Sequence, residues 1–436
     1  MGFAIEDLLS GDKYGTRPRS SNEVRFLPDP EPRERWATII SVDDHVVEPP
    51  EIFEGRFPKK FAEQAPRVID TDNGGQAWLW NGQVLPNVGF NAVAGRPRED
   101  YSFEPTRFDH MRPGAYVIKE RLKEMDRNGV WASVCFPSFL PGFVGQRLTM
   151  WPEDEELAWA AMRAYNDWHL ESWAGEDPMR IIPNQIAWLR DPVKAADEIR
   201  RNAELGFKSV SFSEAPHKLG LPTIHSGYWE PFFAACEETE TVINLHVGSA
   251  GETPTTGDDA PMGVIGALFA ASAFTYTVDW LYSEVAIRYP NIKICMSEGG
   301  IGWVASIIDR VDHLNERGVD AGDDKTDLER PSSALLRRNF WFCALDDPSG
   351  FLTADVIGID NILVESDYPH SDSTWPDTQP LLKQHLSVLS VEDQRKVCFE
   401  NAAKLYRHPV PPNPLPALTG ESGVASPLAM QSSSPS

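Results

Sequence analysis

The chain has 436 residues, enough for one large α/β barrel with insertions or for two to three smaller domains. Hydrophobic residues make up 41% of it, with 14 Trp and 21 Phe, which excludes a wholly disordered chain. The 40 basic and 65 acidic residues give a formal net charge of -25, which repels nucleic acid and anionic membrane surfaces, so we expect a small-molecule partner.

Eight short runs rich in β-branched residues predict eight strands. They are, in chain order, WATIISVDD, VWASVCFPS, RIIPNQIAW, FKSVSFSE, TVINLHVG, NIKICMSEGG, NFWFCALDD and NILVESDYPH. Helical patterns separate most of them, and one, DPVKAADEIRRNAELG, begins with Asp191 and Pro192 and ends at Gly206. Alternating strands and helices predict a parallel sheet that is covered on both faces. The count of eight favours a closed barrel over an open sheet.

Three segments differ from this barrel pattern. Residues 1–35 are rich in charge, Gly and Pro, and are expected to form an arm. Residues 46–129 separate the first two strands and are expected to form an inserted cap, in which GGQAWLWNGQVLPNVGF predicts a hairpin. Residues 409–436 have a composition that cannot bury enough surface to become ordered, so we expect a disordered tail. The barrel is assigned to residues 36–408.

An uncharged segment runs from Pro261 to Val278 and approaches the length that spans a bilayer. Gly, Ser, Thr and Ala dilute its apolar residues, Asp279 follows at once, and no basic flank is present. We therefore predict a helix buried by its neighbours or by a second subunit, and no membrane span. Because such a helix is costly to leave in water, a homodimer or larger homo-oligomer is expected.

Five cysteines are scattered along the chain without a CxxC pair. This argues against a disulfide framework and against a zinc knuckle. The first residues also lack the basic start and continuous apolar core of a secretory signal. A reducing, cytoplasmic location is therefore expected.

Polar residues fall at the ends of several predicted strands. They are Asp43 and His45 on the first, His246 on the fifth, Glu298 on the sixth, and Asp367 and His370 on the eighth. In a parallel barrel the C-terminal strand ends meet at one mouth, and alternate residues of a strand share a side. Two histidines and two aspartates from the first, fifth and eighth strands can therefore surround one divalent ion, such as Zn²⁺, Mn²⁺ or Fe²⁺. The competing interpretation of the first pair is a strand that ends in solvent before a turn at Pro49 and Pro50.

Several motifs in the right order resemble the amidohydrolase superfamily, in particular the amidohydrolase-related branch that includes aminocarboxymuconate semialdehyde decarboxylase and aromatic acid decarboxylases. They are SVDDHVVEPP, RFDHMRPGAYVIKERLKEMDRNGVWASVCFP, LPTIHSGYWEPFFAACEETETVINLHVGSAG, SEGGIGWVASIIDR, ESDYPHSDSTWPD and ENAAKLYR. The resemblance covers about residues 36–408 and implies a distorted (β/α)8 TIM barrel with one divalent metal ion. The implied ligands are Asp43, His45, His246 and Asp367. Many relatives have His-x-His where this chain has Asp-x-His, a change that preserves metal binding but leaves the identity of the metal open. Zn²⁺ is expected first, with Mn²⁺ or Fe²⁺ as alternatives.

The sixth strand also departs from the relatives, which commonly have His where this chain has Glu298. In a dry mouth beside Asp367, the pKa of the Glu298 carboxyl would rise, which permits acid–base catalysis. The alternative is a structural acceptor for the turn at Gly299 and Gly300. Asp367 is expected to act both as ligand and as proton carrier.

Three further residues are candidates for substrate binding. Arg107, like Arg112 in the same loop, can hold a carboxylate by a two-pronged hydrogen bond, although solvated loop arginines are commoner. His225 can point into the mouth or bond to backbone at a helix start. His370 lies near enough to Asp367 to contact substrate, but a turn role is the alternative.

The resemblance implies a metal-dependent carboxy-lyase that decarboxylates a small carboxylated, aromatic or cyclic substrate without oxidation. The alternative is a metal-dependent hydrolase of an ester, lactone or amide. A third hypothesis is a binding protein with the same barrel and no catalytic activity. Aromatic residues of the insertion suit a flat substrate under the cap, or they merely pack the insertion. They are Trp78, Trp80, Phe90, Tyr101 and Phe103.

Overall fold

The eight apolar runs of the sequence all form strands of one parallel sheet in the computed structural model. The strands are β2 (Ile40–Val46), β6 (Ala132–Pro137), β7 (Ile181–Ile182), β8 (Asn184–Ile186), β9 (Ser209–Phe212), β10 (Val242–His246), β12 (Ile294–Ser297), β13 (Phe340–Ala344) and β14 (Ile362–Val364). Their order in the sheet is β7-β6-β2-β14-β13-β12-β10-β9-β8. The structure describes residues 2–4, 24–72, 74–101, 105–138, 140–257, 259–317 and 331–417.

The two outermost strands of that order, β7 and β8, are halves of one extended segment. Pro183, which has no N–H to donate, separates them. Ile181 in the first half pairs with Ser133 of β6, and Asn184 in the second half pairs with Ser209 of β9. The third predicted strand therefore joins the two edges of the sheet, and the predicted (β/α)8 barrel is confirmed.

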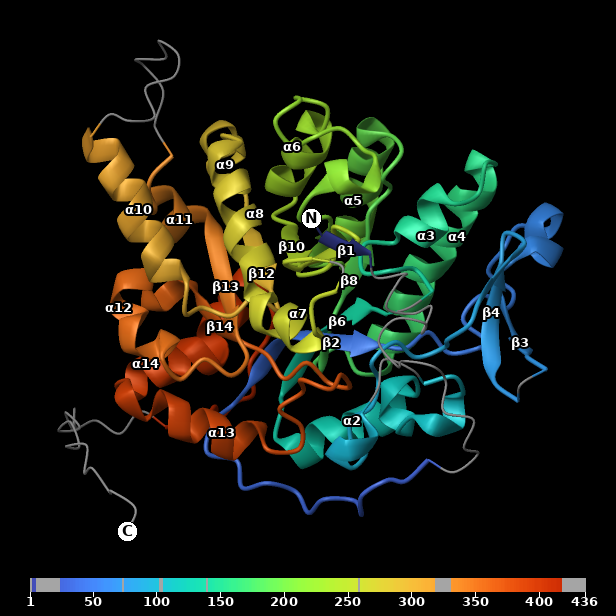
Figure 1. The fold of residues 1–436 in the computed structure, drawn as a ribbon, viewed down its shortest axis with the longest axis horizontal. Coiled ribbons are helices and arrows are strands. Elements are labelled where there is room, and N and C mark those ends of the chain that lie inside the picture. The colour runs from blue at the N-terminus through green and yellow to red at the C-terminus, as the bar shows by residue number, and fades with distance from the viewer. Residues whose placement is uncertain are drawn as a thin grey trace.

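Helices follow the strands and surround the sheet (Figure 1). They are α2 (Ile118–Asn128), α3 (Gln146–Met150), α4 (Glu155–Trp168), α5 (Pro192–Leu205), α6 (Glu230–Glu238), α7 (Met262–Leu268), α8 (Ala270–Tyr282), α9 (Val285–Arg288), α10 (Val304–Arg317), α11 (Ser333–Asn339), α12 (Ala354–Ile357), α13 (Thr378–His385), α14 (Val391–Arg395) and α15 (Asn401–Tyr406). The residues that flank α5 explain where this helix begins and ends. The Asp191 side chain accepts hydrogen bonds from the backbone N–H groups of Val193 and Lys194, and Gly206 ends the helix in the left-handed conformation.

The insertion between the first two barrel strands contains an antiparallel sheet of β3 (Arg67–Asp70), β4 (Gln76–Trp80) and β5 (Gln83–Leu85), set apart from the barrel strands in Figure 1. Asn81 and Gly82 both have positive φ, as the tight turn of the predicted hairpin requires. Trp78 and Trp80 are buried within this region, and the Trp80 Nε1–H donates to the Arg147 carbonyl oxygen at 3.0 Å. These two tryptophans therefore pack the insertion, whereas Phe103 lies outside the described residues.

The described parts of the two ends lie against the barrel. The Leu27 N–H donates to the Gly95 carbonyl oxygen at 2.8 Å, and Asp29 forms ion pairs with Arg112 and Arg127 at 2.8 Å and 2.9 Å. A short strand, β1 (Gly2–Ala4), pairs antiparallel with β11 (Glu252–Pro254). The rest of the predicted arm and tail, residues 1, 5–23 and 418–436, lies outside the described residues, so their expected disorder stays a prediction.

The uncharged segment forms α7 and α8. Within the described chain, Gly263–Tyr282 is one helical stretch long and apolar enough to cross a membrane by length and composition alone, and 33% of its apolar window is buried. Its buried side chains, such as Trp280 and Leu281, face the barrel. An added Cβ at Gly299 would lie 2.5 Å from the Cβ of Ala273, so α8 approaches the end of β12 closely. Most of the other side chains of this segment are partly buried or exposed in the described fold, and burial by a second subunit stays a prediction.

Candidate metal centre

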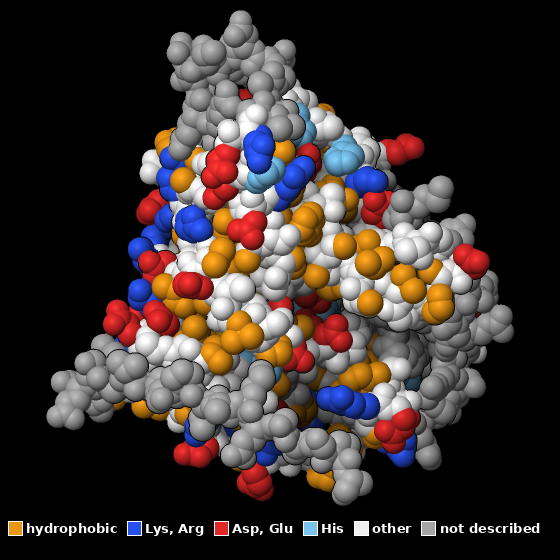
Figure 2. All heavy atoms as spheres, turned by 60° about the vertical axis from the view of Figure 1, so that its left-hand side comes forward, with side chains coloured by type: hydrophobic (Ala, Val, Ile, Leu, Met, Phe, Trp, Pro, Cys, Tyr) orange, Lys and Arg blue, Asp and Glu red, His pale blue; other side chains and the backbone are white. Residues whose placement is uncertain are grey.

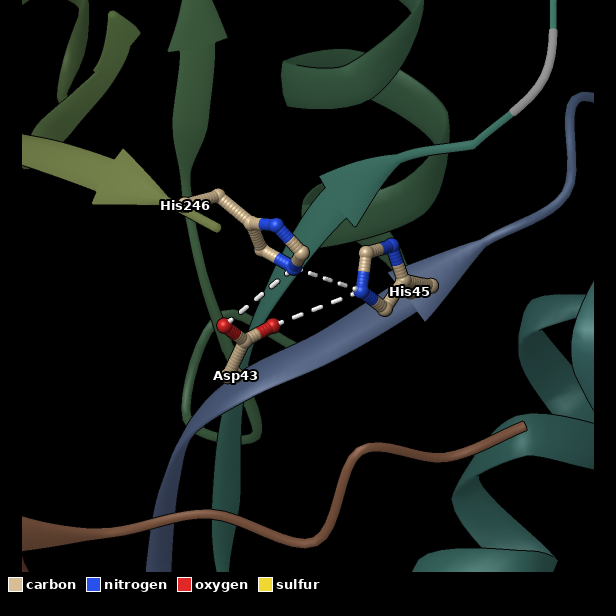
Figure 3. A group of neighbouring side chains, drawn as sticks. All are labelled: Asp43, His45 and His246. Carbon is tan, nitrogen blue, oxygen red and sulfur yellow. Dashed lines mark hydrogen bonds and ion pairs between the residues drawn. The ribbon is translucent and has the colours of Figure 1, made fainter. Parts of the chain in front are cut away.

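A bulge in β2 determines which way the residues of its acidic motif face. The register of β2 against β6 shifts between Ser41 and Asp44, which breaks the strict alternation of side chains. Ser41 and Asp44 consequently share a side, and the Ser41 Oγ lies 3.2 Å from Asp44 Oδ1. Asp43 and His45 lie together at the cluster with His246, which is the last residue of β10 (Figure 3).

Four buried side chains from three strands place their polar atoms close together. The Nε2 atoms of His45 and His246 are 3.0 Å apart, and the two oxygens of Asp43 lie 3.5 Å from one Nε2 each. Asp367, which follows β14, has Oδ1 3.6 Å from the Nε2 of His45. Two atoms that each lie about 2.1 Å from one metal ion are roughly 3.0–3.4 Å apart, so these separations suit one shared ion.

The polar atoms of this cluster lack the partners that buried groups require. Both carboxylate oxygens of Asp43 and the Oδ2 of Asp367 are buried without a hydrogen-bond partner among the described residues, and Asp367 Oδ1 lies 2.9 Å from the His370 Nδ1. The His246 Nδ1–H donates to the carbonyl oxygen of Val247 at 2.6 Å, which leaves its Nε2 as a lone-pair donor. Unpaired buried carboxylates are costly, and one divalent cation would satisfy all of these atoms. Two oxygen and two nitrogen donors suit Zn²⁺, Mn²⁺ or Fe²⁺.

The pKa values of the cluster fit the same conclusion. Burial and the charge of Glu365 raise the pKa of Asp43 well above its usual value, and burial raises the pKa of Asp367 in the same way. Burial and the neighbouring imidazole of His370 lower the pKa of His45. A bound cation would favour ionised carboxylates and neutral imidazoles. It would therefore stabilise the negative charges of Asp43 and Asp367, which burial alone destabilises.

We expect the affinity of this site for a divalent ion to rise with pH. A proton competes with the ion at every pH below the raised pKa values of Asp43 and Asp367, whereas His45 and His246 have lowered pKa values and stay neutral. Displacing one proton changes the affinity about tenfold per pH unit. Competition with a chromophoric chelator should therefore show at least about tenfold tighter binding at about pH 8 than at about pH 5.5. Equal affinity at both values would contradict this account.

Glu298 and His370 lie at the edge of the cluster. Glu298 Oε2 is 3.1 Å from the His246 Nε2, and the pKa of Glu298 is raised by burial and then by the charges of Asp367 and Asp43. The His370 ring stacks on the His45 ring at 3.8 Å, with Nδ1 2.9 Å from Asp367 Oδ1.

Two residues of the site have strained backbones. Glu298 has a φ of 59° and Asp367 a φ of 49°, in the left-handed region that side chains with a Cβ rarely adopt. Such residues cost about 1–3 kcal/mol each and gather at functional sites, because the surrounding structure must hold them there.

A cavity of about 230 Å³ lies beside the cluster, lined by Glu298 and His370 and by aromatic side chains that include Phe90, Phe143 and Phe269. Among the described members of the five aromatic residues predicted to face a substrate from the insertion, Phe90 lines this cavity. A larger open groove of about 760 Å³ lies between the insertion and helices α4 and α5. Its charged side chains form ion pairs with one another, such as Lys194 with Glu155, so the smaller cavity is the better substrate site.

The structure places two predicted substrate-binding residues elsewhere. Arg107 donates to Asp109 at 2.8 Å and to the Gly74 carbonyl oxygen at 2.9 Å, within the insertion. The His225 side chain is 44% exposed, and its Nε2 lies 2.7 Å from Asp279 Oδ1. Neither residue lines the cavity described here, so no contact in the described chain supports their predicted role. His370, the third candidate, lines the cavity.

Asp44, next to the predicted ligand Asp43, has a different role. It accepts hydrogen bonds from the Ser366 hydroxyl at 2.6 Å, from the Tyr368 N–H at 3.0 Å and from the Ser133 hydroxyl. Asp44 therefore ties β2 to β6 and to the segment after β14, which carries Asp367. Strand alternation and the family resemblance both predicted Asp43, and not Asp44, as the acid that accompanies His45, and the structure has Asp43 and His45 together at the cluster.

Arg121 on α2 is a buried charge that cannot be recognised from the sequence, because its charged context is typical of an exposed helix face. Its guanidinium donates to the Gly114 carbonyl oxygen at 2.7 Å and to the carbonyl oxygen of His45. It also lies 4.6 Å from the centre of the Tyr368 ring. Arg121 therefore holds the backbone of the ligand candidate His45 against the loop at Gly114.

Replacing Arg121 with alanine is expected to lower the free energy of unfolding by about 3–5 kcal/mol. The substitution leaves two buried carbonyl oxygens unpaired and opens a cavity beside Tyr368. Thermal unfolding should show a Tm lower by several degrees. Lys119→Ala on the same helix removes an exposed cation and should change the free energy of unfolding by less than about 0.5 kcal/mol. Similar Tm values for the two variants would contradict the assigned role.

Comparisons with known proteins were made with the whole chain. The amidohydrolase family model matches residues 118–408, from the start of α2 to the end of the barrel. No curated protein matches the chain. Among solved structures, an amidohydrolase from Mycobacterium avium subsp. paratuberculosis K-10 is 23% identical with a TM-score of 0.61, covering 85% of this chain and 99% of that chain.

Two further similar structures contain a metal ion. The 5-carboxyvanillate decarboxylase from Novosphingobium aromaticivorans DSM 12444, complexed with manganese and a nitrobenzoic acid, is 18% identical with a TM-score of 0.60, covering 88% and 100% of the two chains. The dihydroxybenzoic acid decarboxylase from Polaromonas sp. JS666, with manganese and the inhibitor 2-nitroresorcinol, is 16% identical with a TM-score of 0.55, covering 85% and 97%. At these identities the likeness is one of fold.

Proposed function

We propose that this chain, which belongs to the amidohydrolase family of enzymes, is a metal-dependent carboxy-lyase that releases CO2 from a small aromatic or cyclic carboxylic acid. The observation that carries the proposal is the buried cluster of unpartnered carboxylates and imidazoles beside an aromatic-lined cavity. Two similar folds that hold manganese, those of 5-carboxyvanillate decarboxylase and dihydroxybenzoic acid decarboxylase, support the choice of reaction.

The proposed ligands are Asp43, His45, His246 and Asp367. Mn²⁺ is the first ion to test because those two decarboxylases hold it, and Zn²⁺, which the sequence favours, is the second. A divalent ion at this place supplies Lewis acidity, which stabilises negative charge on a substrate oxygen.

Glu298 is the proposed acid. Because its pKa is raised, its carboxyl holds a proton at a pH where an ordinary glutamate has lost it. That proton passes to the substrate carbon that bears the carboxylate. The bond between this carbon and the carboxylate then breaks, its electron pair returns to the ring, and CO2 leaves. Glu298 is left as a carboxylate that takes up a proton from water.

The remaining cavity residues orient the substrate and exclude water. The rings of Phe90 and Phe143 lie 6.2 Å apart, and Phe143 also packs on the His246 ring at 4.4 Å. His370 Nε2 is buried without a hydrogen-bond partner among the described residues and is available to a substrate oxygen. An apolar lining keeps bulk water from the reacting carbon and from Glu298.

Turnover on two substrate panels tests this proposal. The metal-loaded protein is incubated with aromatic carboxylic acids in one panel and with esters and lactones in the other. Release of CO2 from at least one acid, and loss of that release after chelation, is the expected result. Ester or lactone turnover without CO2 from any acid would replace the proposal by the hydrolase alternative, and no turnover in either panel would favour a binding protein.

We also propose a cytoplasmic homodimer. All five cysteines are buried and free, which agrees with a reducing compartment. The partly uncovered, apolar helix pair of α7 and α8 supports the second subunit.

A further inference from the structure

The cavity beside the metal cluster runs from a buried end to an exposed end. At the buried end, His370 is 2% exposed and the Glu298 side chain 9% exposed. Asp372 lines the same cavity but is exposed to solvent, so it marks the opening. Figure 2 shows acidic side chains in a hollow on one face of the molecule, beside a group of hydrophobic side chains.

The insertion holds the segment that carries Asp372. The Asn91 side-chain oxygen accepts a hydrogen bond from the Ser371 N–H at 3.4 Å, and the Ala94 N–H donates to the Pro369 carbonyl oxygen at 2.9 Å. Asn91 lines the cavity and has a positive φ of 55°. The segment on the N-terminal side of Asp372 is therefore anchored to the insertion at the opening of the cavity.

The charge of Asp372 acts on the interior of the cavity. After burial, it is the largest cause that raises the pKa of Asp367, and it also contributes to the raised pKa of Glu298. Asp372 also lines the cavity, so its charge lies at the rim of the space that a substrate would occupy. Any charged group at the outer end of a bound ring would meet a fixed negative charge.

The size of the cavity limits the substrate to one ring. Pockets for drug-sized ligands run from about 300 to 1,000 Å³, whereas this cavity has a volume of about 230 Å³. Phe90, Phe143 and Phe269 line it, and a flat apolar ring fits aromatic walls. The substituents of such a ring then reach from His370 and Glu298 at one end to Asp372 at the other.

We propose that the substrate is a single-ring acid with one carboxylate, directed at the buried cluster, and an amino group at the other end, directed at Asp372. An amine gains a charge-assisted hydrogen bond there, whereas a second carboxylate is repelled. The orientation of the first carboxylate rests on the proposed function. The preference for an amine over a second acid rests on the position of Asp372 alone.

Calorimetric binding with the manganese-loaded protein tests this preference. The probes are three benzoates of matched size, which carry an aminomethyl group, a methyl group or a second carboxylate. The wild type should bind the aminomethyl acid about tenfold more tightly than the diacid, Asp372→Asn should abolish most of this difference, and Asp372→Lys should invert it. Asp355→Asn, which removes an exposed charge from α12, is the matched control and should leave the ranking unchanged.

Three results would overturn the inference: tighter binding of the diacid to the wild type, a ranking that Asp372→Asn leaves unchanged, or no binding of any of the three probes. The outcome is separable from the proposed function because binding needs no turnover. The expected ranking without CO2 from any acid would overturn the decarboxylase and keep the inference. CO2 release together with tighter binding of the diacid would overturn the inference and keep the decarboxylase.

Discussion

Replacing Glu298 with glutamine is expected to lower kcat by about 100- to 10,000-fold, the usual contribution of a positioned acid or base. Glutamine keeps the size of the side chain beside the His246 Nε2, 3.1 Å away, but has no acidic proton to deliver. The KM should change little, because the amide still lines the cavity. Steady-state kinetics of the metal-loaded variant, with elemental analysis of the same sample, measures both effects.

The control for this variant is Glu204→Gln, which changes an exposed glutamate of α5 and should leave kcat unaltered. An unaltered kcat in Glu298→Gln would instead assign Glu298 to the turn at Gly299 and Gly300. Loss of the metal together with the activity would make Glu298 a ligand. Either outcome would remove it from the role of acid.

Replacing Asp367 with asparagine is expected to lower the affinity for the metal by at least about 100-fold and to abolish CO2 release. The Oδ2 of this buried carboxylate lacks a hydrogen-bond partner among the described residues, and its Oδ1 lies 2.9 Å from the His370 Nδ1 and 3.6 Å from the His45 Nε2. A neutral amide supplies one weaker oxygen and no charge to balance the cation. Competition with a chelator of known affinity measures the loss.

Asp355→Asn is the matched control for Asp367→Asn. It removes the same charge from an exposed position on α12 and should leave the metal affinity unchanged. A metal affinity in Asp367→Asn equal to that of the wild type would remove Asp367 from the ligand set.

Much of the fold was predictable because its signals are local. Each barrel strand is an apolar run bounded by turn residues, and α5 shows both its capping residue and its terminal glycine in the sequence. The convergence of Asp43, His246 and Asp367 was predictable as well, because the C-terminal ends of parallel strands meet at one mouth. Pro183, which divides the third strand, is also visible in the sequence. Its effect could not be predicted, because it depends on how the two halves of this strand pair with β6 and β9.

The rest of the site depends on contacts between distant residues. Arg121 looks like part of an exposed helix face until the His45 and Gly114 carbonyl oxygens are placed beside it. Glu365, whose pKa burial raises to about 8, is one of several acids near the eighth strand, and its position behind the cluster follows only from the fold. The loop that carries Arg107 has no periodic pattern, so its direction could not be derived from the sequence.

Elemental analysis of protein purified without chelators, for the wild type and for His246→Ala, tests the central claim most directly. We expect about one equivalent of a divalent metal per chain in the wild type and roughly a tenth of that or less in the variant, because the His246 Nε2 lies 3.0 Å from the His45 Nε2 and 3.5 Å from the Asp43 Oδ2. His225→Ala, which changes an exposed histidine, should retain the metal. Equal metal content in wild type and His246→Ala, or no metal in either, would contradict the assignment of this cluster as a metal centre.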